Sequence, residues 1–149
     1  MIDILVIHGP NLNLLGKREP KIYGSMTLSK INLMLGDTAT KLNVKLQIFQ
    51  SNSESYIIEQ IQETLENNIK GIIINPAAFT HTSIAIADAI LAVNIPTVEV
   101  HLSNIFKREK FRHNSYIAPV AQGQICGFGH YGYIMAMHAL VNFLTEQKK

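Results

Sequence analysis

The chain is 149 residues long and 47% hydrophobic, and its 13 basic and 11 acidic residues leave a formal net charge of +2. This length and composition suit one domain with a sizeable core, so we expect a single domain over residues 1–149. The charges are interspersed, apart from a basic run at 107–113, which argues against a nucleic-acid partner.

Cysteine usage and the N-terminal sequence indicate the compartment. Cys126 is the only cysteine, which excludes a disulfide framework and a thiolate zinc site within the chain. The first residues, MIDILVIHGPN, include neither a basic leader nor a small-residue cleavage site, and their apolar run is too short to span a bilayer. We therefore expect a cytoplasmic protein with no membrane partner.

The first third of the chain has the pattern of a strand, a helix and a second strand. Residues 2–7 are a short apolar run, which is typical of a strand. From Leu28 to Leu42 the apolar residues recur at steps of three and four, which predicts an amphipathic helix. The apolar run at 45–49 predicts the next strand.

The second unit repeats this order. Ser51 lies three residues before Glu54, a spacing that predicts a capping box. Helical periodicity follows at 57–65, and the run 71–75 predicts a third strand. Because this strand is apolar on both faces, it is typical of a parallel sheet that is covered on both sides.

The remaining elements complete the alternation. We expect helices at 82–93 and 131–143, and strands at 97–102 and 115–120. Strands and helices that alternate at this spacing predict an α/β fold, namely a flavodoxin-like, doubly wound open sandwich with a five-stranded parallel sheet.

Polar residues follow three of the predicted strands. The sequence His8-Gly9-Pro10-Asn11 follows the first strand, and Asn75-Pro76-Ala77-Ala78 comes at the end of the third. Glu99 and His101 end the fourth. In open parallel sheets, ligands bind beyond the carboxyl ends of the strands. The stretch KREPKIYG, 17–24, follows the first motif, so we expect it at the same rim. A turn would explain Asn-Pro alone, but the convergence of these groups favours a binding site.

Glu99 and His101 form the most specific pair. Alternation along a strand places both side chains on the same side, where the carboxylate can orient the imidazole and favour its protonated form. Such a pair can act as a general acid. A purely structural pair at the edge of the sheet is the alternative.

Two other motifs predict no cofactor or metal site. GFGHYG, 127–132, matches a dinucleotide-binding loop, but only 17 residues follow it, too few for the rest of that motif. We interpret it as the start of the C-terminal helix. His130 and His138 lie eight residues apart, about 80° off one helical face, and no cysteine or carboxylate nearby completes a site.

Four stretches, taken in order, resemble the motifs of type II 3-dehydroquinate dehydratase: GPNLNLLGKREPKIYG, NPAAFTHTSIAIADAI, VEVHLSNIFKREKFRHNSYIAP and GFGHYGYIMAMHAL. Ala77 departs from the pattern, since many members have glycine there. The resemblance implies a flavodoxin-like fold and a lyase that needs neither metal nor cofactor. It also implies a homododecamer built as a tetramer of trimers. The reaction would be dehydration of 3-dehydroquinate to 3-dehydroshikimate in the shikimate pathway of aromatic amino acid biosynthesis.

The resemblance also implies catalytic roles. Tyr23 would be the base, as tyrosinate, although a tyrosine of ordinary pKa is only about 0.1% ionised at pH 7. A nearby cation lowers such a pKa by roughly 1–3 units, so Arg18, together with Arg108, has the required charge. Asn75, or a water that it positions, would stabilise the enolate, while His101, held by Glu99, would protonate the departing hydroxyl.

The same resemblance assigns the substrate contacts. Leu102 and Ser103 would hold the carboxylate, and further contacts would come from Asn11, His81, Arg108 and Arg112. Asp88 interrupts the apolar run IAIADAILAV, where an unpaired carboxylate is costly. In the family, the matching residue reaches the active site of a neighbouring subunit.

Two other functions remain open on the residues alone. A non-catalytic α/β module could bind a small anion at the same rim, but this leaves Tyr23, Asn75, Glu99 and His101 unexplained. A nucleic-acid binder could use the basic segment 107–112, but no aromatic stacking residues are interleaved with a wider basic surface.

Overall fold

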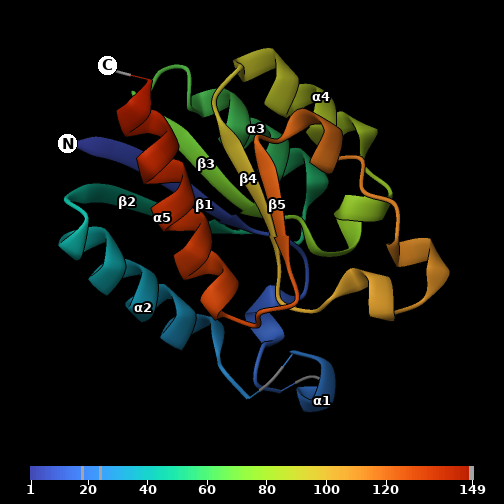
Figure 1. Ribbon diagram of the computed structural model, residues 1–149. Helices are drawn as coiled ribbons and strands as arrows, with labels where there is room; N and C mark the ends of the chain where they lie inside the picture. Colours follow the sequence, from blue (N-terminus) through green and yellow to red (C-terminus); the bar gives the residue numbers. More distant parts are fainter. Residues whose placement is uncertain (18, 24, 148–149) are drawn as a thin grey trace.

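A five-stranded parallel sheet forms the centre of the computed structural model, which describes residues 1–17, 19–23 and 25–147, without the side chains of residues 20 and 23 (Figure 1). The strands are β1 (Ile2–His8), β2 (Val44–Gln50), β3 (Gly71–Asn75), β4 (Thr97–His101) and β5 (Gly123–Cys126). Their spatial order is β2-β1-β3-β4-β5. This order and the parallel pairing confirm the doubly wound, flavodoxin-like prediction.

Helices cover both faces of the sheet. The α-helices of the described residues are α1 (Pro20–Tyr23), α2 (Leu28–Lys41), α3 (Glu54–Glu63), α4 (Ile84–Val93) and α5 (Tyr131–Glu146). In Figure 1, α2 and α5 lie over one face of the sheet, and α3 and α4 lie over the other.

Strand alternation divides the core between these two faces. Ile4 and Val6 of β1 pack with residues of α2 and α5, whereas Leu5 and Ile7 pack with residues of α3 and α4. β3 follows the same rule, and all five of its residues are buried. The prediction of a strand that is apolar on both sides is thereby confirmed.

The predicted fifth strand at 115–120 is wrong. Residues 118–120 form a 3₁₀ turn, and the fifth strand is β5, three residues further along the chain. The Ser115 hydroxyl accepts hydrogen bonds from the N–H groups of Ile117 and Ala118, which bends the chain before a ladder can form. The sequence of β5, GQIC, contains no run of apolar residues because this edge strand is only partly buried.

The predicted capping box at Ser51 is also wrong. The N-cap of α3 is Ser53, whose hydroxyl accepts a hydrogen bond from the Tyr56 N–H at 3.4 Å. Ser51 instead accepts a hydrogen bond from the Ser53 N–H at 3.0 Å, one step earlier in the turn. The serine that caps the helix is thus the one whose backbone is extended directly before the first helical residue.

Candidate active site at the carboxyl edge of the sheet

A cavity of about 100 Å³ lies at the carboxyl ends of β1, β3 and β4. Its lining residues come from the segments that follow these strands: Pro10, Asn11, Leu12, Ala77, Ala78, His81, His101, Leu102, Ser103, Ile105, Arg108 and Arg112. Most of the predicted substrate-binding residues therefore meet in one place, where the sheet topology predicted a ligand site.

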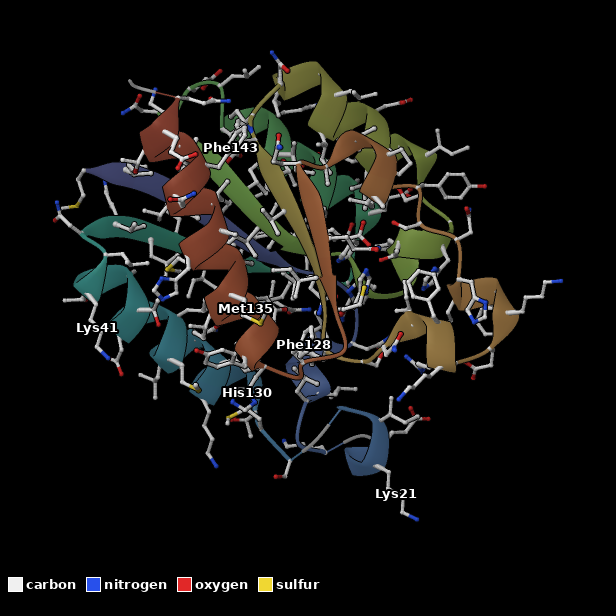
Figure 2. The ribbon with its side chains drawn as sticks, in the orientation of Figure 1. Lys21, Lys41, Phe128, His130, Met135 and Phe143 are labelled. Atoms are coloured by element: carbon white, nitrogen blue, oxygen red, sulfur yellow. The ribbon has the colours of Figure 1, made fainter. Side chains whose placement is uncertain are left out.

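A wider hollow of about 710 Å³ adjoins this cavity and shares Leu102, Ser103 and Arg108 with it. Lys30, Lys107 and His130 also line the hollow. Figure 2 shows His130 in the loop that leads into α5, at the end of the molecule where α1 lies. The approach to the cavity is therefore basic, which favours an anionic ligand.

Glu99 and His101 form a buried pair at the base of the cavity. The Nε2 atom of His101 lies 2.5 Å from Oε2 of Glu99, and both side chains are almost fully buried. Because Nε2 donates to the carboxylate, Nδ1 is the ring nitrogen that can exchange a proton with a ligand. The predicted orientation of the imidazole by Glu99 is thus present in the structure.

Two further residues fix the Glu99 carboxylate. It accepts hydrogen bonds from the Ser115 hydroxyl at 2.8 Å and from the Gln124 amide at 2.7 Å. Burial by itself would raise the pKa of Glu99, but the hydrogen bonds and the charge of His101 outweigh burial and lower that pKa below its usual value. The carboxylate stays ionised, as an orienting group for His101 requires. The sequence interpretation missed Ser115 and Gln124, which lie 16 and 25 residues from Glu99 along the chain.

His81 lies beside His101, with the two rings stacked at a centroid distance of 6.5 Å. Its Nδ1 lies 2.8 Å from the carbonyl oxygen of Asn114, to which it donates, so Nε2 is the nitrogen that can accept a hydrogen bond. Burial lowers the pKa of His81, with the nearby His101 and Arg112 acting in the same direction. A neutral His81 suits contact with a hydroxyl group.

The two arginines of the cavity have other contacts in the structure. Arg108 donates to the Ser103 hydroxyl at 3.5 Å, and Arg112 donates through Nε to Glu109 at 2.8 Å. Glu109 is more than half exposed, so its ion pair with Arg112 is screened by solvent and weak. The Arg112 guanidinium can therefore turn toward an anionic or hydroxylated ligand.

Asn75 does not line the cavity. Its side chain is buried, and its Oδ1 accepts a hydrogen bond from the N–H of Ala77 at 3.1 Å. Ala77 has a φ of 51°, in the left-handed region that favours glycine, which costs an alanine about 1 kcal/mol. Asn75 thus supports the turn from which Ala77 and Ala78 line the cavity.

The predicted base and its cation are only partly covered by the structure. Arg18 and the Tyr23 side chain lie outside the described residues. Ile22, in the same short helix α1 as Tyr23, lines the wider hollow together with Ser103. The segment predicted to supply the base is therefore next to the cavity.

Asp88 lies away from the cavity of its own chain. It is exposed on α4, where Ile84 and Leu91 are each 58% exposed. These residues follow one another at helical spacing on the solvent face of α4. Asp88 therefore cannot complete its own chain's cavity from this position.

His8 was predicted to belong to the rim, but the structure buries it completely. Its Nδ1 lies 2.8 Å from the Tyr133 hydroxyl, and its Nε2 lies 2.9 Å from Oδ1 of Asn32. Burial lowers the pKa of His8 to about 4, although the hydrogen bond to Asn32 partly opposes this shift. His8 is therefore neutral near pH 7.

This burial predicts an acid-sensitive stability. An unfolded chain binds a proton at His8 below pH of about 6.5, whereas the folded protein does so only below about 4. Between these values the unfolded state binds more protons, so stability falls as the pH falls, by about 3 kcal/mol in total. Urea unfolding at a series of pH values measures this loss. In His8→Asn most of the slope between pH 6.5 and 4 should disappear; an unchanged slope would show that His8 is not its source.

Among residues 1–17, 19–23 and 25–147, no group of three or more His, Cys, Asp or Glu side chains could hold a metal ion. Burial, together with the charge of Glu99, raises the pKa of the Cys126 thiol to about 11, which makes the thiol unreactive near pH 7. No helix in the described part of the chain is long and apolar enough to cross a membrane.

Known proteins match both the sequence and the fold. The profile of the family described as dehydroquinase class II matches residues 2–141. A 3-dehydroquinate dehydratase of Trichodesmium erythraeum is 57% identical over 147 residues, which cover 99% of this chain and 97% of the relative. One of Gloeothece citriformis is 60% identical over 144 residues, with 97% and 94% covered.

The solved structures agree with this assignment. The crystal structure of type II dehydroquinase from Butyrivibrio crossotus superposes with a TM-score of 0.92 at 48% identity, covering 93% of this chain and 97% of that one. The resemblance noted from the motifs is thereby confirmed. The chain belongs to the class II dehydroquinase family and is an enzyme of the hydro-lyase class.

Proposed function

We propose that the protein dehydrates 3-dehydroquinate to 3-dehydroshikimate in this cavity, as a cytoplasmic step of the shikimate pathway toward aromatic amino acids. The observation that carries this proposal is the buried Glu99–His101 pair at the base of a cavity with a basic approach. The names of the relatives support the same reaction. A non-catalytic module that binds an anion would need the basic residues of the approach but not the Glu99–His101 pair.

The elimination divides into two proton transfers. Tyr23, as tyrosinate, removes the proton from the carbon next to the ketone, and the electron pair moves to the ketone oxygen as an enolate. Arg18 lowers the pKa of Tyr23. Asn75, or a water that it positions, stabilises the enolate. The enolate then collapses and expels the hydroxyl group as water, which takes its proton from Nδ1 of His101.

Substrate binding follows from the charges and donors of the cavity. The backbone at Leu102 and the Ser103 hydroxyl hold the substrate carboxylate, next to the Arg108 guanidinium. His81 and Arg112 contact the ring hydroxyls, with Asn11 nearby. The proposed mechanism uses side chains, backbone groups and water, and calls for neither metal nor cofactor.

The test compares two ligands that differ only at the reacting centre. Quinate has a hydroxyl group in place of the ketone, so it can occupy the cavity but has no acidic proton next to a carbonyl. We expect the protein, treated with excess chelator, to convert 3-dehydroquinate completely and to leave quinate unchanged, as followed by proton NMR. Binding of both ligands without conversion of either would support an anion-binding module instead.

We further propose a homododecamer, a tetramer of trimers, in which Asp88 reaches the cavity of a neighbouring subunit. The apolar residues beside Asp88, Ile84 and Leu91, support this because each exposes more than half of its surface in the single chain. Burial of such residues stabilises contacts between subunits.

Leu91→Glu should therefore break the assembly and lower activity, and Asp88→Ala should weaken both substrate binding and assembly. Sedimentation velocity and initial rates measure these effects. Leu65→Glu is a matched control, because Leu65 is 67% exposed and lies outside α4. A Leu91→Glu protein of unchanged size would contradict the proposed use of this face.

A further inference from the structure

A buried chain of polar side chains runs beneath the cavity, on the face of the sheet that α2 and α5 cover. Its members come from four elements: Asn32 from α2, His8 from β1, Tyr133 from α5 and Asn75 from β3. His8, Tyr133 and Asn75 are each at most 3% exposed. None of the four lines the cavity, and the reaction steps above use only Asn75.

The hydrogen bonds of this chain can have only one direction. The carbonyl oxygen Oδ1 of Asn32 accepts, so Nε2 of the neutral His8 is its donor. Nδ1 of His8 is then an acceptor, and the Tyr133 hydroxyl must donate its proton to it.

The direction continues to Asn75. Its Oδ1 already accepts from the N–H of Ala77, so its amino group is the end that can donate to the Tyr133 oxygen. The Tyr133 hydroxyl can thus accept from Asn75 on one side while it donates to His8 on the other. A flipped Asn75 amide would present oxygen to the hydroxyl and N–H₂ to the N–H of Ala77, and both contacts would fail.

The backbone places two members of this chain, His8 and Asn75, side by side. His8 and Asn75 are register partners in β1 and β3, so their side chains lie on the same face of the sheet. The next residue, Gly9, donates to the Asn75 carbonyl at 2.8 Å. A Cβ at Gly9 would come within 2.6 Å of the Pro76 backbone, so only glycine permits this close approach.

We propose that Tyr133 and His8 are positioning residues for the active site. They fix the Asn75 amide in one orientation, and through it the left-handed turn at Ala77 that forms part of the cavity wall. Asn32 holds the far end of the chain and sets the tautomer of His8. The inference rests on the proposed function, because it assigns these residues to the site of that reaction.

The kinetic test compares Tyr133→Phe, which keeps the shape of the core, with Asn75→Ala and with the double variant. Tyr133→Phe removes one oxygen and should lower kcat about tenfold, with KM within about twofold, because the substrate contacts are intact while Asn75 loses its orientation. Asn75→Ala should lower kcat about a hundredfold. In the Asn75→Ala background, Tyr133→Phe should cost nothing more, since its effect passes through Asn75. If the loss of kcat in the double variant equals the product of the two single losses, the proposal is overturned.

His8 offers a rescue that a merely structural role would not give. His8→Leu removes the acceptor for the Tyr133 hydroxyl and should lower kcat about as much as Tyr133→Phe. In His8→Asn an amide oxygen can take the place of Nδ1, so most of kcat should return. Equal losses in both variants would contradict the proposal. Thr64→Val is the control, because it deletes a buried hydroxyl that bonds Ile61 near the end of α3 and should leave kcat unchanged.

A second readout does not depend on activity. The side-chain amide protons of Asn75, assigned by their absence in Asn75→Asp, should exchange slowly with solvent in the native protein. In Tyr133→Phe this protection should fall at least tenfold. Suppose that protection falls in Tyr133→Phe but that the native protein does not turn over 3-dehydroquinate. This result would contradict the proposed reaction and still support the positioning of Asn75 by Tyr133. Unchanged protection of the Asn75 amide in Tyr133→Phe would contradict the proposal that Tyr133 positions Asn75.

Discussion

Replacing His101 by alanine is expected to lower the dehydration rate by roughly 10²–10⁴-fold, the range of a lost general acid. The base acts before the acid in the proposed sequence, so the variant should still exchange the proton next to the ketone with solvent. The two events are separable in deuterium oxide, where NMR follows loss of the substrate's proton and absorbance follows the conjugated product.

The outcome depends on which step is lost. Slow dehydration with retained exchange supports the assignment of His101 to the second step. Equal loss of both would mean that His101 also acts in the first step, against the proposed division of roles. His138→Ala is a matched control because His138 is exposed on α5, and it should keep full activity. Glu99→Gln should also slow dehydration, but less than His101→Ala does. It keeps the shape of the Glu99 side chain but removes the charge that orients the His101 ring.

The second large effect is expected at Tyr23. Tyr23→Phe deletes the ionisable oxygen with little change of volume, so it should abolish both proton exchange and dehydration while leaving quinate binding almost unchanged. Calorimetric titration with quinate separates the two effects. Substantial dehydration by Tyr23→Phe would require another base.

Arg18 should act through the ionisation of this tyrosine. In the proposed mechanism activity rises with pH as Tyr23 loses its proton, and loss of the Arg18 cation is expected to return the tyrosine pKa toward its ordinary value. The rise in the pH–rate profile of Arg18→Ala should therefore move upward, by as much as roughly 1–3 units. Arg18→Lys should recover part of this shift, because it keeps the charge but not the planar guanidinium group. A profile that is lowered equally at every pH, without moving, would make Arg18 a positioning or transition-state residue.

The sequence predicted most of the fold because its strands are marked by hydrophobic runs. The predicted bounds of β3, 71–75, match the structure at both ends. All five residues of this strand are buried, and its apolar run stops at the polar Asn75. β5 was missed because an edge strand needs no such run. The false strand at 115–120 contains several apolar residues, but the Ser115 side chain bends it into a turn.

The parts of the site that depend on the pattern within a single strand could be predicted from the sequence. Alternation along β4 predicted the Glu99–His101 contact, and the carboxyl ends of the strands predicted the cavity. The partners of Glu99 and the chain through His8 depend on contacts between distant segments, such as the 125 residues that separate His8 from Tyr133. No local pattern records such a pairing. His8 was for this reason interpreted as a rim residue when it is a buried one.

The most direct test of the proposed reaction is the ultraviolet absorbance of the conjugated product after 3-dehydroquinate is added to the purified, chelator-treated protein. The proposed function predicts a progress curve of many turnovers, with an initial rate proportional to protein concentration and sharply reduced by His101→Ala. The absence of any absorbance change at protein concentrations equal to that of the substrate, with the substrate bound, would contradict it.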